Sequence, residues 1–168
     1  YNADTSKALI LWTEGNSEWS LNGVMATINT TTGAVTVGST VEFLSGDNGS
    51  GSNGYPWSGG SGAFAIATYD TNVDRYFVTY AMSGNGYNHA GLKGFVCYNN
   101  TGTSISSGSH SFIRENGYVY GAGNYYVTAM GAENKMAVTY FHRAYGSGGS
   151  EDTSTSGNRG YHTHLITV

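Results

Sequence analysis

The sequence predicts an all-β protein, and its composition and its internal pattern both support that fold class. Gly (26), Ser (19), Thr (19) and Asn (15) make up 79 of the 168 residues, while 14% of residues are aromatic and only 11% are charged. Turn-forming residues mixed with β-branched and aromatic residues favour short strands joined by tight connections. So few charges with so many aromatic residues argue against a disordered chain.

The chain repeats a polar turn followed by an apolar strand. In each copy the turn brings a basic residue, Lys7, Arg75 or Lys135, to the start of an apolar run that ends in an aromatic residue. Such self-similarity is the sequence signature of a repeat architecture. The aligned segments are 1–12, 69–80 and 129–140, and a second pair, 27–39 and 96–109, aligns after a slip of one residue.

One complete copy predicts four antiparallel strands. Asn85-Gly86 is a hairpin signal, because both central residues of a type I′ turn take positive φ. The expected strands are 63–69, 75–81, 92–98 and 103–113. Four repeated antiparallel strands are typical of the blade of a β-propeller, and such a blade needs neighbours stacked on it. A β-sandwich with internal duplication is the alternative fold.

Three repeat units divide the chain. We expect repeat 1 at 1–62 without its first strand and with a Gly-rich loop, a complete repeat 2 at 63–124, and repeat 3 at 125–168 without its last strand. A closed propeller takes four to eight blades, and open sheet edges promote aggregation. We therefore expect either a homo-oligomer or a part of a longer chain.

Charge and cysteine content exclude several classes of partner. The net charge of −4 provides no basic surface for a nucleic acid, and no apolar run is long enough for a membrane span. Cys97 is the single cysteine, so an intrachain disulfide is excluded and a small buried thiol is expected. We expect no nucleic acid partner, no membrane span and no cofactor.

The long Gly-rich loops at 47–57 and 145–160 are the expected recognition elements. Aromatic side chains beside Asn and Ser groups suit stacking on sugar rings, although they also suit packing between sheets or chains. By contrast, we expect Trp12, Tyr80 and Tyr140 to pack in the core. The expected ligand-binding or partner-binding residues are Trp19, Tyr55, Trp57, Tyr87, Tyr118 and Tyr120.

Two groups of potential metal ligands do not add up to a metal site. His162 and His164 alternate on one strand, so they share a face, which we expect to be polar and exposed. No motif supplies a third zinc ligand. The run 47–53 contains one acidic residue, too few for a calcium loop. A third zinc ligand would have to be His89, His110 or His142, and the oxygen donors for calcium would be Asp47, Asn48 and Asn53.

No catalytic motif is present, and we expect no enzyme. Carboxylates are scattered and lie mostly at turns, as Asp70 and Asp74 do, where Asp caps the local backbone. Patterns of a serine nucleophile, a zinc protease or a phosphate-binding loop are absent.

Three N-glycosylation sequons begin at Asn29, Asn48 and Asn99. Their number is what chance predicts for so Asn-rich, Ser-rich and Thr-rich a chain. Asn29 and Asn99 are expected at equivalent positions of the repeat, in an exposed turn.

The pattern of Tyr69-Asp70, Arg75, Val78 and Tyr80, followed by 84–87 and 103–109, resembles a known tandem β-repeat. It is found in virion-surface and tail-fibre proteins of cyanophages and related marine viruses, and in secreted microbial adhesins. The resemblance covers most of the chain and is specific to the repeat, from which this chain departs by its long Gly-rich inserts. It implies an extracellular or virion-exposed propeller-like scaffold and carries over no catalytic residue.

These observations predict a non-enzymatic structural and adhesive module, exposed on a virion or cell surface. We expect it to contact glycans or a host-surface receptor through its aromatic Gly-rich loops. The alternative is a subunit of a secreted, glycosylated extracellular filament, in which the aromatic residues serve assembly.

Overall fold

The computed structural model describes residues 5–14, 20–45, 55–56, 65–83, 91–115, 118–119, 125–129, 134–143 and 159–167. These residues form strands and turns, and every strand pairing among them is antiparallel. The all-β prediction is therefore confirmed. No helix in this part of the chain is long and apolar enough to cross a membrane.

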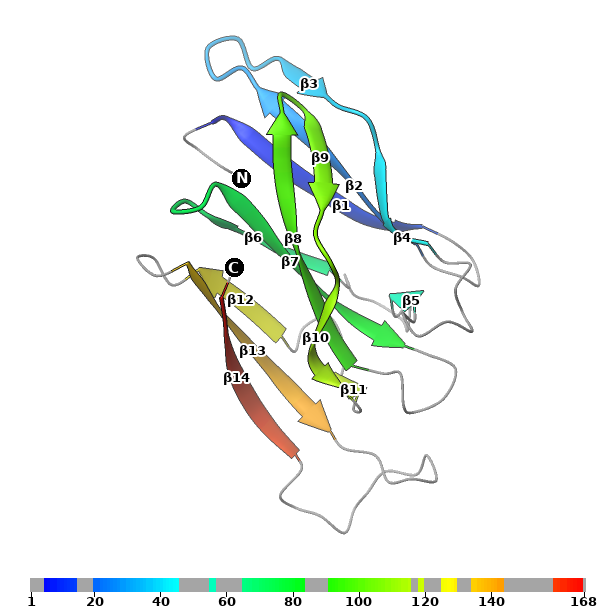
Figure 1. Ribbon diagram of the computed structural model, residues 1–168. Coiled ribbons are helices and arrows are strands. Elements are labelled where there is room, and N and C mark those ends of the chain that lie inside the picture. Colours follow the sequence, from blue (N-terminus) through cyan, green and yellow to red (C-terminus); the bar gives the residue numbers. More distant parts are fainter. Residues whose placement is uncertain are drawn as a thin grey trace.

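The strands form three sheets that follow one another along the chain (Figure 1). Sheet A contains β1 (Lys7–Glu14), β2 (Ser20–Ile28), β3 (Val35–Val37) and β4 (Val41–Leu44). Sheet B contains β5 (Tyr55–Pro56), β6 (Ala65–Asp70), β7 (Arg75–Ser83), β8 (Gly91–Thr101), β9 (Ser104–Ser107) and β10 (Ser111–Glu115). Sheet C contains β11 (Tyr118–Val119), β12 (Tyr125–Ala129), β13 (Lys135–Arg143) and β14 (Arg159–Thr167).

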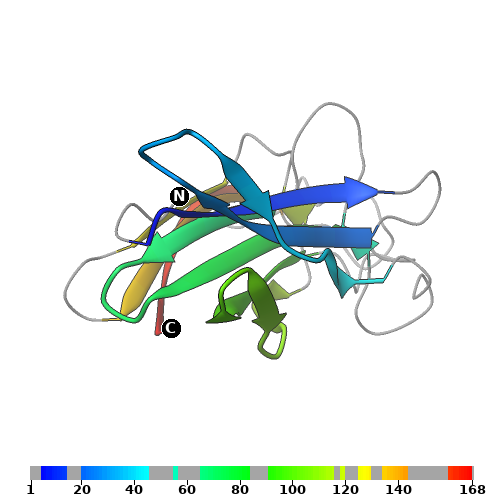
Figure 2. The ribbon, with the colours of Figure 1, turned by 90° about the horizontal axis from the view of Figure 1, so that it is seen from above.

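Sheet B lies between the other two, as Figures 1 and 2 show, and both of its faces are covered. Side chains alternate between the two faces of a strand. On β7, accordingly, Tyr76, Val78 and Tyr80 pack with residues of sheet A, whereas Phe77 packs with residues of sheet C. This arrangement provides two separate hydrophobic cores, one on each face of sheet B.

The core between sheets A and B requires close approach of the two layers. The rings of Phe43 and Phe95 lie 5.0 Å apart, centroid to centroid, and the Tyr76 hydroxyl donates to the backbone carbonyl of Lys7 over 3.3 Å. Gly23 on β2 leaves room for the Phe43 ring in this core, because a Cβ on residue 23 would lie 2.4 Å from Phe43 Cε2. A side chain at this position would displace the aromatic ring that fills the core.

Backbone conformation repeats at the turns that precede β1, β7 and β13. Ser6, Asp74 and Asn134 all have positive φ, at 54°, 51° and 53°, although none of them is glycine. Asn and Asp tolerate this left-handed region better than most residues do. The three positions are those that the sequence alignment equates, directly before the basic residue of each copy.

We call residues of different sheets equivalent when they hold the same position in the ladder. β1, β7 and β13 are equivalent strands, and so are their direct partners β2, β8 and β14. The prediction of antiparallel sheets is confirmed, and over the described residues the sheets form an open stack with no closed ring. The unit limits at 62/63 and 124/125 stay a prediction.

Two details of the predicted strands are wrong. The expected strand 103–113 is divided into β9 and β10, because three residues, 108–110, lie opposite two residues of β8 and interrupt the ladder, although the Gly108 N–H still donates to the Val96 carbonyl over 2.8 Å. The half-buried His110 in this interruption packs on Tyr80 and Phe95. The short strands β5 and β11 were not expected, because two residues carry no periodicity.

The expected equivalence of Asn29 and Asn99 is also wrong. Asn99 lies within β8 opposite Ile105, so its equivalent in sheet A is Ile28, opposite Val35. Asn29 instead begins a longer turn, in which its exposed side-chain oxygen accepts hydrogen bonds from the N–H groups of Thr31 and Thr32 at 3.0 and 2.9 Å. The one-residue slip in the alignment reflects these different turn lengths.

Candidate functional site

Several of the predicted binding residues are close in sequence to strand ends that lie at one end of the stack. We call it the loop end, defined by the last residues of β1, β7 and β13, which are Glu14, Ser83 and Arg143. Figure 1 shows these three strands ending on the same side, with β5 and β11 beside the ends of β7 and β13. Tyr55 pairs with Ser83, and Tyr118 pairs with Arg143.

These two pairings are equivalent, which the sequence analysis did not recognise. Ser83 and Arg143 hold the same ladder position in sheets B and C, so Tyr55 and Tyr118 are equivalent. Each begins a Tyr-x-aromatic motif, Tyr55-Pro56-Trp57 and Tyr118-Val119-Tyr120. The signal was present in the sequence, but the inserts that follow differ in length and mask the alignment.

The described residues include only part of the predicted binding set. For Tyr55 and Tyr118 the structure describes the backbone alone, so the positions of their rings stay a prediction. The segments 15–19 and 84–90, with Trp19 and Tyr87, connect strand ends at the loop end and lie outside the described residues. Trp57, Tyr120 and the sequon and calcium run at 47–53 also lie outside them.

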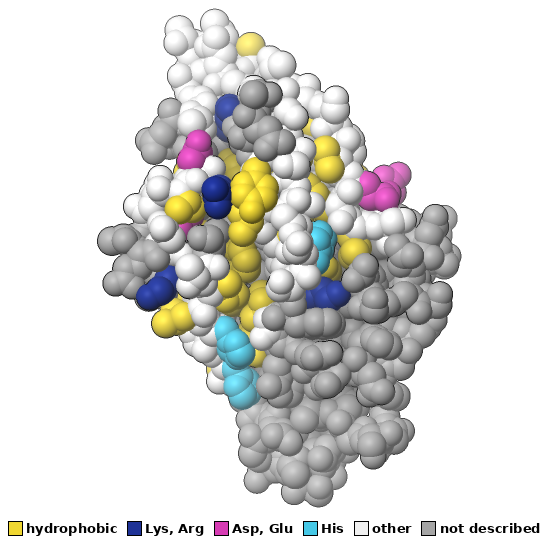
Figure 3. Space-filling model, viewed as in Figure 1, with side chains coloured by type: hydrophobic (Ala, Val, Ile, Leu, Met, Phe, Trp, Pro, Cys, Tyr) yellow, Lys and Arg dark blue, Asp and Glu magenta, His cyan; other side chains and the backbone are white. Residues whose placement is uncertain are grey.

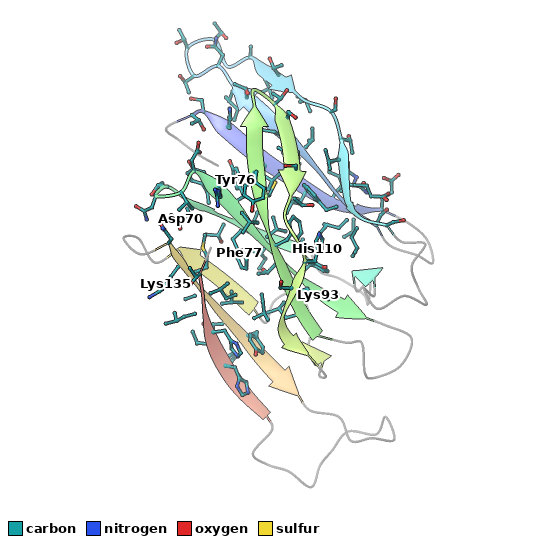
Figure 4. The ribbon with its side chains drawn as sticks, viewed as in Figure 1. Asp70, Tyr76, Phe77, Lys93, His110 and Lys135 are labelled. Atoms are coloured by element: carbon teal, nitrogen blue, oxygen red, sulfur yellow. The ribbon has the colours of Figure 1, made fainter. Side chains whose placement is uncertain are left out.

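Near the loop end of sheet B, Tyr80, Lys93, Phe95 and His110 form a compact polar and aromatic cluster. Figure 4 labels Lys93 and His110, which lie close together there. The Tyr80 hydroxyl lies 2.7 Å from Nδ1 of His110, and either group can be the donor, depending on the tautomer. The His110 ring stacks on Phe95 with centroids 4.4 Å apart. Lys93 is buried and lies directly opposite Tyr80 in the ladder.

Burial determines the protonation of this cluster. Burial, followed by the charge of Lys93, lowers the pKa of His110, while burial raises the pKa of Tyr80. Both rings are therefore neutral near neutral pH, which suits a fixed hydrogen bond between them. The cluster holds the β9–β10 connection against the core rather than presenting a reactive base.

A second tyrosine–histidine pair lies in sheet C. Tyr140 is the equivalent of Tyr80, and its hydroxyl lies 3.0 Å from Nε2 of His164. The ring of His162 stacks near Tyr140 at 5.8 Å. The two histidines do share a face, but it is half-buried and turned toward sheet B, so the expectation of an exposed face is wrong.

The packing of Tyr80 and Tyr140 in the core is confirmed, because both are fully buried. The same expectation is wrong for their equivalent in sheet A, Trp12, which is half-buried, lies on the face that points away from sheet B and belongs to neither hydrophobic core of the described residues. Cys97 is a buried free thiol, as expected, and burial raises its pKa to about 12. A thiol of that pKa is protonated and unreactive at neutral pH.

Among the described residues, no three metal-ligating side chains come together. The acidic side chains at turns act locally, as expected. Asp70 Oδ1 accepts a hydrogen bond from the N–H of Asn72 over 2.9 Å, and Asp74 accepts one from the Tyr69 hydroxyl over 2.5 Å.

Comparison with known proteins finds no matching protein family, no similar curated protein and no similar solved structure. The structure itself is that of an all-β protein with several antiparallel sheets. The resemblance to phage and adhesin repeats depends on the sequence motifs alone.

Proposed function

We propose that this chain is a non-enzymatic, propeller-like structural and adhesive module that binds glycans through its loop end. It acts on the surface of a virion or a cell, in contact with a glycan or a host receptor. The proposal is supported mainly by one observation: two Tyr-x-aromatic motifs begin at equivalent ladder positions at the loop end. Tyr55 pairs with Ser83, and Tyr118 pairs with Arg143.

A repeated aromatic motif suits a repeated ligand. Sheets that pack face to face are about 10 Å apart, so equivalent residues of sheets B and C recur at about that spacing. Aromatic rings at regular intervals provide several apolar platforms for one extended polymer. Adjacent Asn and Ser groups supply hydrogen bonds to hydroxyl groups, and several weak contacts then add through multivalency.

The stacked sheets provide a rigid base for these loops. Both faces of sheet B are buried, and the Tyr80–His110 pair fastens the connection before β10. Binding residues are commonly found on loops that such a scaffold positions.

Retention on a panel of immobilised polysaccharides tests the proposal. Trp57→Ala and Tyr120→Ala should each weaken retention about tenfold or more, because a buried aromatic anchor carries much of the binding energy. Thr31→Ala, in the turn at the opposite end of sheet A, is the matched control and should bind as the unaltered chain does. Release of new reducing ends from the polysaccharide would contradict the non-enzymatic assignment.

The alternative, a subunit of a secreted filament, is favoured by a different observation. Large apolar side chains are exposed on sheets A and C, among them Val35, Val37, Tyr161 and Leu165. In that case Trp57→Ala should impair assembly rather than polysaccharide binding.

A further inference from the structure

The exposed apolar side chains occur on two opposite faces of the stack. In the described part of the chain, the large hydrophobic residues that are exposed lie either on sheet A or on sheet C. On sheet A they share one face, because Ile10 lies opposite Val24 on β2, and Val35 and Val37 lie opposite Ile28 and Ala26. The full set is Ile10, Val35, Val37, Tyr161 and Leu165.

The face of sheet A that carries them points away from sheet B. Leu9 and Leu11, which alternate with Ile10, pack in the core between sheets A and B. Tyr161 and Leu165 likewise alternate on β14 with Ile166, which packs in the core between sheets B and C. We call these surfaces the outer face of sheet A and the outer face of sheet C.

On the outer face of sheet A, the exposed positions are equivalent to buried core positions of the other sheets. Ile10 is 46% exposed, whereas its equivalents Val78 and Val138 are fully buried. Val35 is 58% exposed, whereas its equivalent on β9, Ile105, is buried against sheet A.

The exposed positions on the outer face of sheet C are likewise equivalent to buried positions in the other sheets, but they lie on the opposite face of the sheet from the Ile10 position. Leu165 is 63% exposed, and its equivalent in sheet A, Met25, is fully buried. Tyr161 is 71% exposed, and its equivalents Leu21 and Leu92 are fully buried. Every internal interface thus joins a surface of the Leu165 type on one sheet to a surface of the Ile10 type on the next.

We propose that the outer face of sheet A binds the outer face of sheet C of a second copy of this chain. The occupant is a second copy because the missing surface, of the Leu165 type, is one that this chain itself presents. The contact would continue the same stacking that already joins A to B and B to C. It does not depend on the proposed glycan site.

The charged side chains of the two faces lie at opposite ends of the strands. Glu14 and Glu42 lie near the loop end on the outer face of sheet A, whereas Lys135 is the first residue of β13 on the outer face of sheet C. The proposed contact therefore depends on the apolar side chains and not on pairs of opposite charges. A contact between two different faces is heterologous, so it produces a ring or an open filament.

Sedimentation of the full chain and two lysine variants tests the interface. Ile10→Lys blocks the outer face of sheet A, and Leu165→Lys blocks that of sheet C. The unaltered chain should associate between micromolar and millimolar concentration, and each variant alone should associate about tenfold or more weakly, since a charge would be buried in the contact. An equimolar mixture should form dimers and nothing larger, because each variant retains one intact face.

Thr36→Lys is the matched control, because Thr36 is exposed on β3 but alternates with Val35 and Val37. It should associate as the unaltered chain does. Circular dichroism checks folding, and Val35→Lys and Tyr161→Lys serve as the second variant of each face. A monomeric unaltered chain, self-association of either variant alone, or a monomeric mixture would overturn the proposal.

Discussion

Val78 and Ile10 hold the same ladder position in sheets B and A, yet only Val78 is buried. Both are β-branched residues near the middle of an equivalent strand, and both have apolar neighbours. Two things differ: Val78 is covered by sheet A and lies on a strand flanked by β6 and β8, whereas Ile10 lies on β1, which pairs with β2 alone among the described strands and which no described strand covers. Val24, directly opposite Ile10 on the central strand β2, is only 6% exposed, so burial depends on neighbouring strands as well as on the covering sheet.

The largest expected effect contrasts these two positions directly. Val78→Asp places a carboxylate in the core between sheets A and B and should lower the free energy of unfolding by about 4 kcal/mol or more. Ile10→Asp should lower it by about 1 kcal/mol or less in dilute solution. Urea unfolding of both variants measures the difference, and equal losses would contradict the role of the covering sheet.

A smaller effect is expected from adding one methyl group to a covered face. A Cβ on Gly94 would lie 2.7 Å from Phe77 Cζ and 3.2 Å from the Val78 carbonyl, so Gly94→Ala should destabilise the chain by about 1–3 kcal/mol. Its equivalent on the outer face of sheet C is the exposed residue Thr163. Thr163→Ala should change stability by about 0.5 kcal/mol or less, which thermal unfolding can compare.

Removing one hydroxyl tests the tyrosine–histidine pairs. Tyr80→Phe leaves His110 without its partner in a half-buried site and should cost about 1–2 kcal/mol. Tyr140→Phe should cost a similar amount through His164. Chemical denaturation gives both values, and no loss in either variant would show that these hydrogen bonds, each within one sheet, do not stabilise the fold.

The smallest effect is a pH dependence that comes from His110. Its pKa is lowered in the folded chain by burial and by Lys93, so below about pH 6.5 the unfolded chain binds the proton more readily. Stability should be constant above that pH and decrease as the pH falls below it. His110→Gln should flatten this part of the profile of unfolding free energy against pH, and an unchanged profile would assign the effect to other groups.

The sequence predicted the strands well where the repeat was regular. The basic residue before each apolar run, as at Lys7 and Arg75, marked the start of a strand within one position of the ladder. Alternation could not assign faces on β7, because sheet B is covered on both sides and its strand is apolar throughout. The break at Gly108 and the pairing of Tyr55 with Ser83 depend on contacts between distant residues.

The candidate site was harder to predict than the strands. Tyr80 and Tyr140 were recognised as core residues, but their histidine partners come from different strands, His110 after β9 and His164 on β14. No local pattern encodes such a contact. The equivalence of Tyr55 and Tyr118 was also hidden, because it follows from the strand ladder and not from constant spacing.

Cross-linking of two cysteine variants is the most direct test of the stacking account. Ile10→Cys and Leu165→Cys each place an exposed thiol on one outer face, while native Cys97 stays buried with a pKa of about 12. With a short bis-maleimide, the mixture should give a covalent dimer of one Ile10→Cys chain and one Leu165→Cys chain, and neither variant alone should give one. Covalent dimers of Ile10→Cys alone, or none in the mixture, would contradict the account.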